Sequence, residues 1–303
     1  MAKVQSNFFY NLEKKINFCI IGVAGYIAPR HLEAIKALGH NLLLSYDPSD
    51  NVGVIDKYFP NSLFFNKYPK FENEFIKLKN KIDYLVVLAP NYLHFKYIKF
   101  GLIHKINVIC EKPLVLSPKQ LQEIGKLEKK YDKKVYNILQ LRTLKVVRNL
   151  KKTINDKKFY HVMINYITPR GHWYQSSWKG NDKKSGGLLF NIGIHLIDLV
   201  CYLFKDLNSY KTIKLNSNSA KGTILFNNAK VHFNLSIQKK DLNKYNKLVI
   251  RDFIINHKKI DLAKDFEQAH IDCYKQIINH SLFRIDTVKP SIILATKLKN
   301  ALL

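Results

Sequence analysis

The chain has 303 residues, of which 47% are hydrophobic; this suits a globular protein of two domains and excludes a disordered chain. No apolar run approaches the roughly 20 residues of a membrane-spanning helix, and the N-terminus lacks the apolar segment of a signal peptide. We therefore expect a short N-terminal leader, a cytoplasmic location and no membrane partner. The four cysteines are far apart, without a CxxC pair, which predicts reduced thiols and no zinc site.

The formal net charge of +27 raises the possibility of nucleic-acid binding. Only six of the 50 basic residues are arginine, however, and the lysines form pairs scattered along the whole chain. Nucleic-acid surfaces depend on arginine for bidentate contacts, so we interpret the charge as a compositional bias and expect no specific nucleic-acid partner. A positive field would still attract an anionic substrate.

The first half of the sequence alternates buried strands with helices. Apolar runs predict six strands, at 16–22, 41–47, 62–65, 82–90, 106–110 and 134–140. Helical patterns lie between several of them, at 28–39, 71–79, 92–104 and 117–131, the last opened by a Ser117–Gln120 capping box. This alternation predicts an α/β fold: a Rossmann doubly wound parallel sheet over residues 1–143.

The pattern changes after about residue 145. Five regularly spaced strands are predicted, at 159–167, 210–216, 220–227, 229–238 and 245–256, and two helices, at 263–280 and 291–303. We expect residues 144–303 to form an α+β domain with an open, mainly antiparallel sheet, which binds the substrate and contacts other subunits. The C-terminal helix is expected to pack back on the first domain.

A glycine-rich turn follows the first predicted strand. Gly22, Gly25 and Ala28 can supply the tight turn, the close approach to a pyrophosphate and the helix–strand packing of a dinucleotide site, with Tyr26 and Ile27 between them. Asp47 ends the next strand, where a carboxylate binds ribose hydroxyls and repels a 2′-phosphate. These residues predict NAD as cofactor; the alternative is that both segments are only polar turns.

Ligands of such sheets bind beyond the carboxyl ends of the strands, and two further motifs lie there. They are "APNYLH" at 89–94 and "CEKP" at 110–113. The remaining residues expected to contact the cofactor are therefore Ala89, Pro90, Asn91, His94, Glu111, Lys112 and Gln140. Lys112 is singled out, because a lysine beside a reacting hydroxyl can bond and steady its oxygen.

The stretch "SGGLLFNIGIHLID" at 185–198 is apolar except for three polar residues after its glycines. On a helix, Asn191, His195 and Asp198 would share one face as a single polar stripe. His195 is either a core histidine with one satisfied hydrogen bond or a reacting group. Gly193 weakens a helix by about 1 kcal/mol, which suggests that something approaches its backbone closely.

A polar and aromatic loop at 168–180, "TPRGHWYQSSWKG", carries groups that suit a nucleotide sugar. The alternative is a structural loop anchored by its two tryptophans. With the preceding motifs, the residues expected to bind substrate are Lys112, Arg142, Arg170, Tyr174, Ser177, Trp178, Lys179, Asn191 and His195.

These motifs, taken in order, resemble the glucose–fructose oxidoreductase/inositol dehydrogenase (Gfo/Idh/MocA) family. The matching features are the glycine turn running to His31, Pro90-Asn91-x-x-His94, Glu111-Lys112-Pro113 and the segment from Gly186 to His195. The resemblance implies a lysine and a histidine flanking the reacting carbon, an often cis Lys–Pro peptide, and homo-oligomers, dimers or tetramers. Departures are "LRTLKVVR" after Gln140 and an asparagine at 191, where most of the family has aspartate.

Within the family, the chain most resembles the UDP-N-acetylglucosaminuronate 3-dehydrogenases of bacterial surface-polysaccharide pathways. The resemblance implies NAD-dependent oxidation of the sugar 3-hydroxyl to a 3-keto nucleotide sugar. The catalytic residues would be His195 as base, Lys112 bonding the same oxygen, and Asn191 orienting substrate or cofactor. Alternatives are a related dehydrogenase acting on another sugar or inositol, and a non-catalytic nucleotide- or RNA-binding protein.

Overall fold

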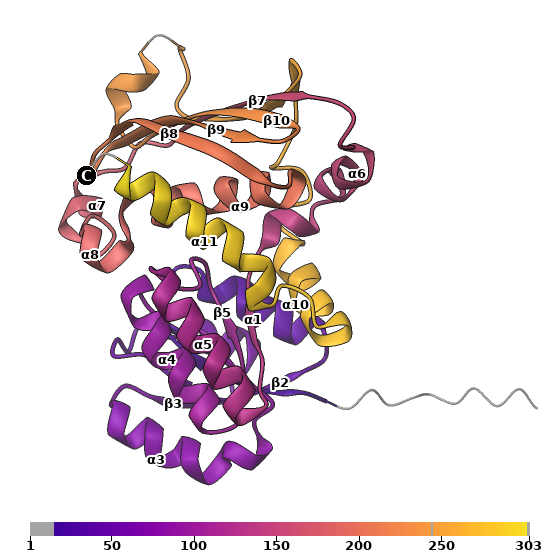
Figure 1. The fold of residues 1–303 in the computed structure, drawn as a ribbon. Coiled ribbons are helices and arrows are strands. Elements are labelled where there is room, and N and C mark those ends of the chain that lie inside the picture. The colour runs from indigo at the N-terminus through magenta and orange to yellow at the C-terminus, as the bar shows by residue number, and fades with distance from the viewer. Residues whose placement is uncertain (1–14, 244, 302–303) are drawn as a thin grey trace, which may run out of the picture.

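The computed structural model describes residues 15–243 and 245–301; the predicted leader lies outside these residues. Two six-stranded sheets lie one above the other in Figure 1, with helices between them and around the lower sheet. The order of the elements confirms the predicted alternation of strands and helices in the first half and the change of pattern after it.

The first sheet is a doubly wound parallel sheet, as predicted, with strand order β3-β2-β1-β4-β5-β6. Its strands are β1 (Asn17–Ile21), β2 (Asn41–Tyr46), β3 (Leu63–Phe65), β4 (Tyr84–Val87), β5 (Asn107–Cys110) and β6 (Val135–Asn137). The order reverses between β1 and β4, so a crevice forms beyond their carboxyl ends, where ligands bind in such folds.

Helices cover both faces of this sheet, which is why its strands are apolar throughout. They are α1 (Ala28–Ala37), α2 (Val54–Tyr58), α3 (Tyr68–Leu78), α4 (Asn91–Ile103) and α5 (Pro118–Tyr131). The sequence did not predict α2, because five residues carry too little periodicity. The capping box of α5 is half correct: Ser117 Oγ accepts from the Gln120 amide, but Gln120 Oε1 accepts from Leu116 instead of Ser117.

The second sheet has the order β12-β11-β7-β10-β9-β8. Its strands are β7 (Tyr160–Ile167), β8 (Leu207–Leu215), β9 (Ser219–Phe226), β10 (Ala229–Ser236), β11 (Ile250–Ile255) and β12 (Lys258–Lys259). The prediction of a mainly antiparallel sheet is confirmed, with one exception: β10 runs parallel to β7. The long connection between those two strands allows this pairing, which a hairpin would not.

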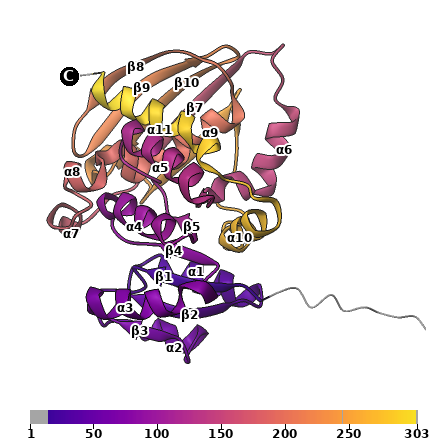
Figure 2. The same cartoon turned by 60° about the horizontal axis from the view of Figure 1, so that its bottom comes forward.

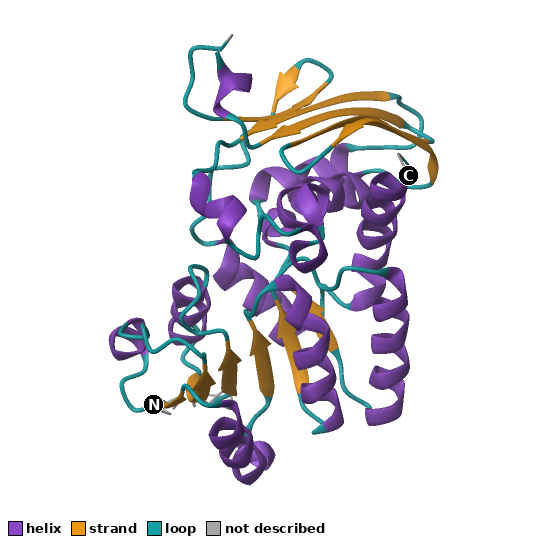
Figure 3. Cartoon of the chain, turned by 90° about the vertical axis from the view of Figure 1, so that its left-hand side faces the viewer, coloured by secondary structure: helices purple, strands orange, loops and turns teal. Residues whose placement is uncertain are grey.

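Helices lie between the two sheets, as Figures 2 and 3 show, and the described part of the second half contributes six α-helices to the molecule. They are α6 (Lys145–Thr153), α7 (His172–Ser176), α8 (Asp182–Ser185), α9 (Ile194–Leu203), α10 (Ala269–His280) and α11 (Ile285–Asn300). α10 packs against α1, and α11 packs against α5 as well as α9. The last two helices therefore bind both halves of the molecule together.

The expectation that no apolar run approaches the length of a membrane span is wrong: within the described ranges, one helical stretch, Asp182–Leu203, is long and apolar enough to cross a bilayer, and most of it is buried in the fold. Its burial explains its apolar composition, since a core helix between a sheet and other helices is surrounded by protein. The four cysteines are free thiols, as expected.

Candidate active site

The glycine turn after β1 is shaped for close backbone approach. Gly22 has φ +94°, and a Cβ there would lie 2.6 Å from the carbonyl carbon of Leu88. A Cβ on Gly25 would lie 3.2 Å from the Gly22 oxygen. Helix α1 then begins at Ala28, and no side chain caps its N-terminus at Ile27. The positive end of the α1 dipole behind a glycine turn favours a pyrophosphate at this place.

Asp47 follows β2 and lies beside that turn. Its Oδ2 accepts a 3.0 Å hydrogen bond from the Ala24 amide, and its Oδ1 accepts one of 2.9 Å from the Ser49 amide. The side chain of Tyr26 in the turn is 94% exposed. The carboxylate is therefore fixed against the turn, at the position from which it can accept from ribose hydroxyls.

The side chains of the "APNYLH" motif after β4 join separate segments of the chain by hydrogen bonds. Asn91 Nδ2 donates to the Ser185 carbonyl at 2.9 Å, and both ring nitrogens of His94 face carbonyl oxygens, those of Pro113 and Ala89, at 2.7 and 2.8 Å. Burial lowers the pKa of His94. Both side chains are therefore bonded within the protein, and their expected contacts with the cofactor stay predictions.

Lys112 follows β5, and its side chain contacts the segment just before α9. Its peptide bond to Pro113 is cis, as the resemblance implied. Its Nζ donates to the backbone carbonyl of Asn191 at 3.3 Å. Burial lowers the pKa of Lys112; Glu111 opposes this shift, whereas Lys179 and Arg170 add to it.

Asn191 joins Lys112 to the polar loop of the second half. Its Nδ2 donates to the Tyr174 hydroxyl at 2.7 Å, and burial raises the pKa of that hydroxyl. Lys112, Asn191 and Tyr174 therefore form one connected set drawn from three distant segments.

The helix that carries Asn191 differs from the one predicted. Residues Leu189–Gly193 form a π-helical turn before α9, so the assumption of one continuous α-helix is wrong there. Bonds of the i→i+5 kind change the angular offset between Asn191 and His195. A Cβ on Gly193 would lie 2.9 Å from Leu235 Cδ1, so the close approach inferred from this glycine comes from strand β10.

His195 is partly exposed, and none of the described residues hydrogen-bonds to its ring. This is not the environment of a core histidine with one satisfied bond. Burial, with the charge of Lys112 adding to it, lowers the pKa of His195 to about 3. The ring is therefore neutral at ordinary pH and holds a lone pair that can accept a proton.

Arg142 does not lie free in the site, contrary to the sequence-based expectation. Its Nε and Nη2 donate to the Asp198 carboxylate at 2.8 and 2.6 Å, and Nη2 also donates to the Thr287 carbonyl. Both side chains of the pair are almost fully buried. The predicted polar stripe is thus split, because Asp198 holds Arg142 while His195 stays unpaired.

Gln140 is also buried, and its Oε1 has no hydrogen-bond partner.

The loop at 168–180 brings positive charge close to Lys112. Lys179 Nζ lies 5.1 Å from the ring centre of Trp173 and 5.8 Å from that of Trp178, and burial lowers its pKa, with Arg170 adding to the shift. A hollow of 360 Å³ lies beside the loop, lined in part by Arg170, Tyr174 and Lys239. Ser177 Oγ, in contrast, donates to the Tyr174 carbonyl inside the loop.

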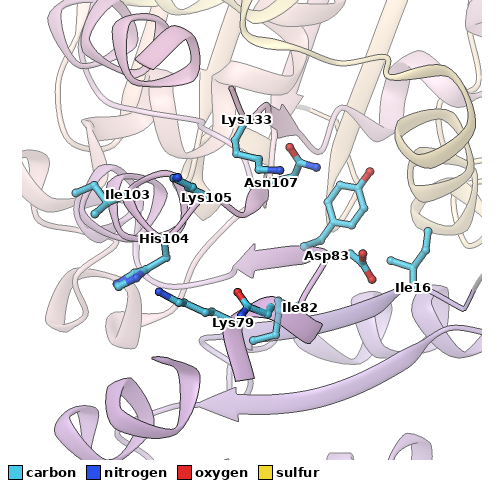
Figure 4. A pocket seen from close by; sticks show the side chains of 11 residues that line it. Ile16, Lys79, Ile82, Asp83, Ile103, His104, Lys105, Asn107 and Lys133 are labelled. Carbon is cyan, nitrogen blue, oxygen red and sulfur yellow. The ribbon is translucent and has the colours of Figure 1, made fainter. Parts of the chain in front are cut away.

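Figure 4 shows a larger hollow, of 750 Å³, at the opposite, amino edge of the first sheet. Lys79, Lys105 and Lys133 surround it from three segments. It lacks the glycine turn and every predicted site residue, so it is separate from the candidate active site.

Glu111 has partners that the sequence analysis did not identify. Its Oε1 lies 3.1 Å from His31 Nε2 and 3.5 Å from His270 Nε2, and its Oε2 accepts from the Lys112 amide. His270 comes from α10, far along the chain, and nothing in the sequence pointed to it. His31 was noted only as the end of the glycine-turn motif. The carboxylate is therefore bonded within the protein, and its expected contact with the cofactor stays a prediction.

A doubly wound sheet with a glycine turn, an acidic residue after β2, and a lysine and a neutral histidine near its carboxyl edge define a dinucleotide-dependent oxidoreductase. Comparison with known proteins gives the family. The sequence profile of the GFO/IDH/MocA oxidoreductase family, with an NAD-binding Rossmann fold, matches residues 16–138, and that of the GFO/IDH/MocA C-terminal domain matches residues 147–233. The chain belongs to this family, and its cofactor is NAD.

Among solved structures, the chain is similar to a WlbA (WbpB) dehydrogenase from Thermus thermophilus, solved with NAD and UDP-GlcNAcA. The two are 33% identical over 94% of this chain and 95% of that one, with a TM-score of 0.88. The WlbA dehydrogenase of Bordetella pertussis, 17% identical with a TM-score of 0.77 and covering 95% and 96% of the two chains, shows the same fold.

Among curated proteins, the chain is 29% identical to glucose-6-phosphate 3-dehydrogenase of Bacillus subtilis. That match covers 68% of this chain and 58% of the relative. The chain thus spans little more than half the length of this curated relative.

Proposed function

We propose that this protein oxidises the 3-hydroxyl of UDP-N-acetylglucosaminuronic acid with NAD, giving a 3-keto nucleotide sugar for surface-polysaccharide synthesis. The observation that carries the proposal is the connected set of Lys112, Asn191 and Tyr174 beside the unpaired ring of His195. The similarity over nearly the full length to a dehydrogenase solved with NAD and UDP-GlcNAcA supports this choice of substrate.

The charges around the set suit a substrate of this kind. Arg170 and Lys179 each lower the pKa of Lys112, so three cations lie within electrostatic reach of one another. Such a cluster is costly without anions, and a carboxylate or a diphosphate would relieve the repulsion. Arg170 and Lys239 line the adjoining hollow, which leaves room for the nucleotide part.

The residues of the glycine turn fit NAD. Gly22 leaves no room for a Cβ, Gly25 leaves little, and the start of α1 points its positive dipole end at the turn. When bound, NAD supplies a hydride acceptor.

The remaining chemistry belongs to side chains of this protein. His195, neutral and unpaired, accepts the proton of the substrate hydroxyl. The Lys112 ammonium bonds the same oxygen and stabilises the negative charge that develops on it. Asn191 orients Lys112 because its backbone carbonyl accepts from the Lys112 ammonium. Its side-chain amide holds the loop at 168–180 by donating to the Tyr174 hydroxyl. An uncharged asparagine cannot act as a second base, so the proton leaves through His195.

Turnover of purified protein with NAD and UDP-N-acetylglucosaminuronic acid tests the proposal. Lys112→Ala and His195→Asn should each abolish NADH formation while the melting temperature stays near that of the wild type. Lys99→Ala, which removes a surface lysine paired with Glu123, and His257→Asn, at an exposed turn, are matched controls and should stay active. Full activity in Lys112→Ala and His195→Asn would refute the assignment.

A related dehydrogenase acting on another sugar or on inositol is the second candidate, and the similarity to glucose-6-phosphate 3-dehydrogenase favours it. Both reactions remove hydride from a secondary alcohol, so they differ only in what binds the rest of the substrate. Parallel assays with glucose 6-phosphate and myo-inositol separate them: stronger turnover of either would select this candidate. Assays with added α-ketoglutarate, which the Thermus thermophilus dehydrogenase binds beside NAD, would show whether NADH is reoxidised in place.

A homo-oligomer belongs to the same proposal. The upper face of the second sheet in Figure 1 is not covered by α9 or α11. Met163 and Ile213 on its strands are 53% and 52% exposed. A sheet face that the helices of its own chain leave open is available to a second subunit, as the resemblance to the family implies. Light scattering should give a dimer or tetramer in a cytoplasmic extract and in the purified protein.

A further inference from the structure

A buried polar cluster adjoins the backbone of Lys112. It consists of His31 on α1, Glu111 at the end of β5, and His270 and Tyr274 on α10. All four side chains are at least nine-tenths buried. Polar groups buried to this degree are retained only where they are bonded or where they have a task.

The contacts form a directed chain. The Tyr274 hydroxyl lies 2.9 Å from His31 Nδ1, and His31 Nε2 lies 3.1 Å from Glu111 Oε1. With a neutral His31 protonated at Nε2, the hydroxyl donates to the ring and the ring donates to the carboxylate. Glu111 Oε2 then accepts from the backbone amide of Lys112 at 3.0 Å. The chain runs from α10 to the peptide that carries the catalytic lysine.

The carboxylate keeps its charge in this setting. Burial alone would raise the pKa of Glu111, but His270 and His31 outweigh it and hold that pKa well below its usual range. The negative charge in turn raises the pKa values of Lys112 and His195 against the effect of their burial. One buried anion therefore acts on both proposed reacting groups.

We propose that Glu111, held by His31 and Tyr274, is a positioning residue: it aims the Lys112 peptide and supplies the counter-charge for Lys112 and His195. The docking of α10 on α1 thereby becomes part of the active site, since two members of the cluster come from α10. The turnover test of this inference rests on the proposed function, whereas the titration of Lys112 is measured without any substrate.

The same ligand atoms could hold a transition metal, because His31 Nε2, Glu111 Oε1 and His270 Nε2 lie within 4.8 Å of one another. The hydrogen bonds favour the network instead. They satisfy His31 and both carboxylate oxygens without an ion, and in the cluster only His270 Nε2, 3.5 Å from Glu111 Oε1, lacks a hydrogen bond. Metal analysis of the purified protein decides between them.

The first test measures Lys112 without any substrate. The rate at which acetic anhydride acylates Lys112, followed by mass spectrometry of its peptide across pH, gives the midpoint of its titration. Glu111→Gln, which keeps the shape and removes the charge, should move this midpoint to lower pH. The groups that face Lys112 from other elements, His94, Arg170, Lys179 and His195, are unchanged in this variant. An unmoved midpoint would overturn the counter-charge role, whatever the substrate proves to be.

The second test measures turnover. Glu111→Gln should lower kcat about 10- to 100-fold, and Tyr274→Phe, which removes one hydroxyl that reaches Lys112 only through His31 and Glu111, about 3- to 10-fold. KM should stay within about 2-fold of the wild type in both. Tyr160→Phe is the matched control, because its hydroxyl also bonds one partner, the Asn155 amide, in the second sheet. It should lower only the melting temperature.

Two results would overturn the positioning role. One is a Tyr274→Phe variant that behaves like Tyr160→Phe, losing stability but not kcat. The other is one equivalent of metal in the wild type that is lost in His270→Ala. If the wild type shows no turnover while the Lys112 midpoint still shifts, the proposed substrate is wrong and the network stands.

Discussion

Replacing Arg142 by methionine tests whether this residue supports the fold or binds the substrate. Methionine has a similar length but no charge, so the Asp198 carboxylate would be left almost fully buried without its bidentate donor. The Thr287 carbonyl at the start of α11 would lose a donor as well. Leaving a buried charge uncompensated costs about 3–5 kcal/mol, out of a total stability of about 5–15 kcal/mol for a domain.

Urea denaturation measures this loss as a lower midpoint with an unchanged m-value. The double variant Arg142→Met/Asp198→Leu removes both charges and should recover most of the lost stability, because apolar replacements of buried pairs are often neutral or stabilising. The folded fraction of either variant should keep its KM. The reasoning fails if Arg142→Met unfolds within about 1 kcal/mol of the wild type and has a KM for the nucleotide sugar raised tenfold or more.

Three further predictions follow from the geometry of the site. Gly22→Ala should destabilise the protein by at least about 2 kcal/mol and weaken NAD binding, because its Cβ meets the Leu88 backbone; Gly53→Ala, in open space, is the control in a thermal melt with and without NAD. The folded pKa of His195, about 3, lies below its unfolded value of about 6.5, so the unfolded state binds more protons between them and stability falls as pH drops through that window. His195→Gln should reduce this slope, by up to about 1.4 kcal/mol per pH unit, in denaturation at pH 7 and pH 5; an equal slope in both proteins would contradict the prediction. Tyr174→Phe removes the acceptor of the Asn191 amide and should lower kcat/KM about tenfold, whereas unchanged kinetics would show that this bond does not position Asn191.

The parts of the fold that local sequence encodes were predictable. The apolar runs and the glycine turn place the first sheet and the start of α1, and the position of Lys112 at a strand end placed it at the carboxyl edge. His195 was recognisable because a histidine among aliphatic neighbours demands an explanation. Each of these inferences needs only a few consecutive residues and the geometry of one element.

The interactions that the sequence did not reveal join residues that are distant in the chain. In the sequence Arg142 has no evident partner, because Asp198, to which it is paired in the fold, is 56 residues away. Asn91 donates to Ser185, which is 94 residues away. The contact of Glu111 with His270 forms only when α10 packs against α1. The π-turn before α9 was also missed, since only its hydrogen-bond pattern distinguishes it from an α-helix.

Hydride transfer from carbon 3 of the sugar is the central claim, and isotope labelling measures it directly. UDP-N-acetylglucosaminuronic acid carrying deuterium at C3 is incubated with the protein and NAD, and the reduced cofactor is analysed by mass spectrometry. The account predicts one deuterium in the NADH formed and a 3-keto sugar as product. Unlabelled NADH, or no NADH while the protein still binds NAD, would contradict it.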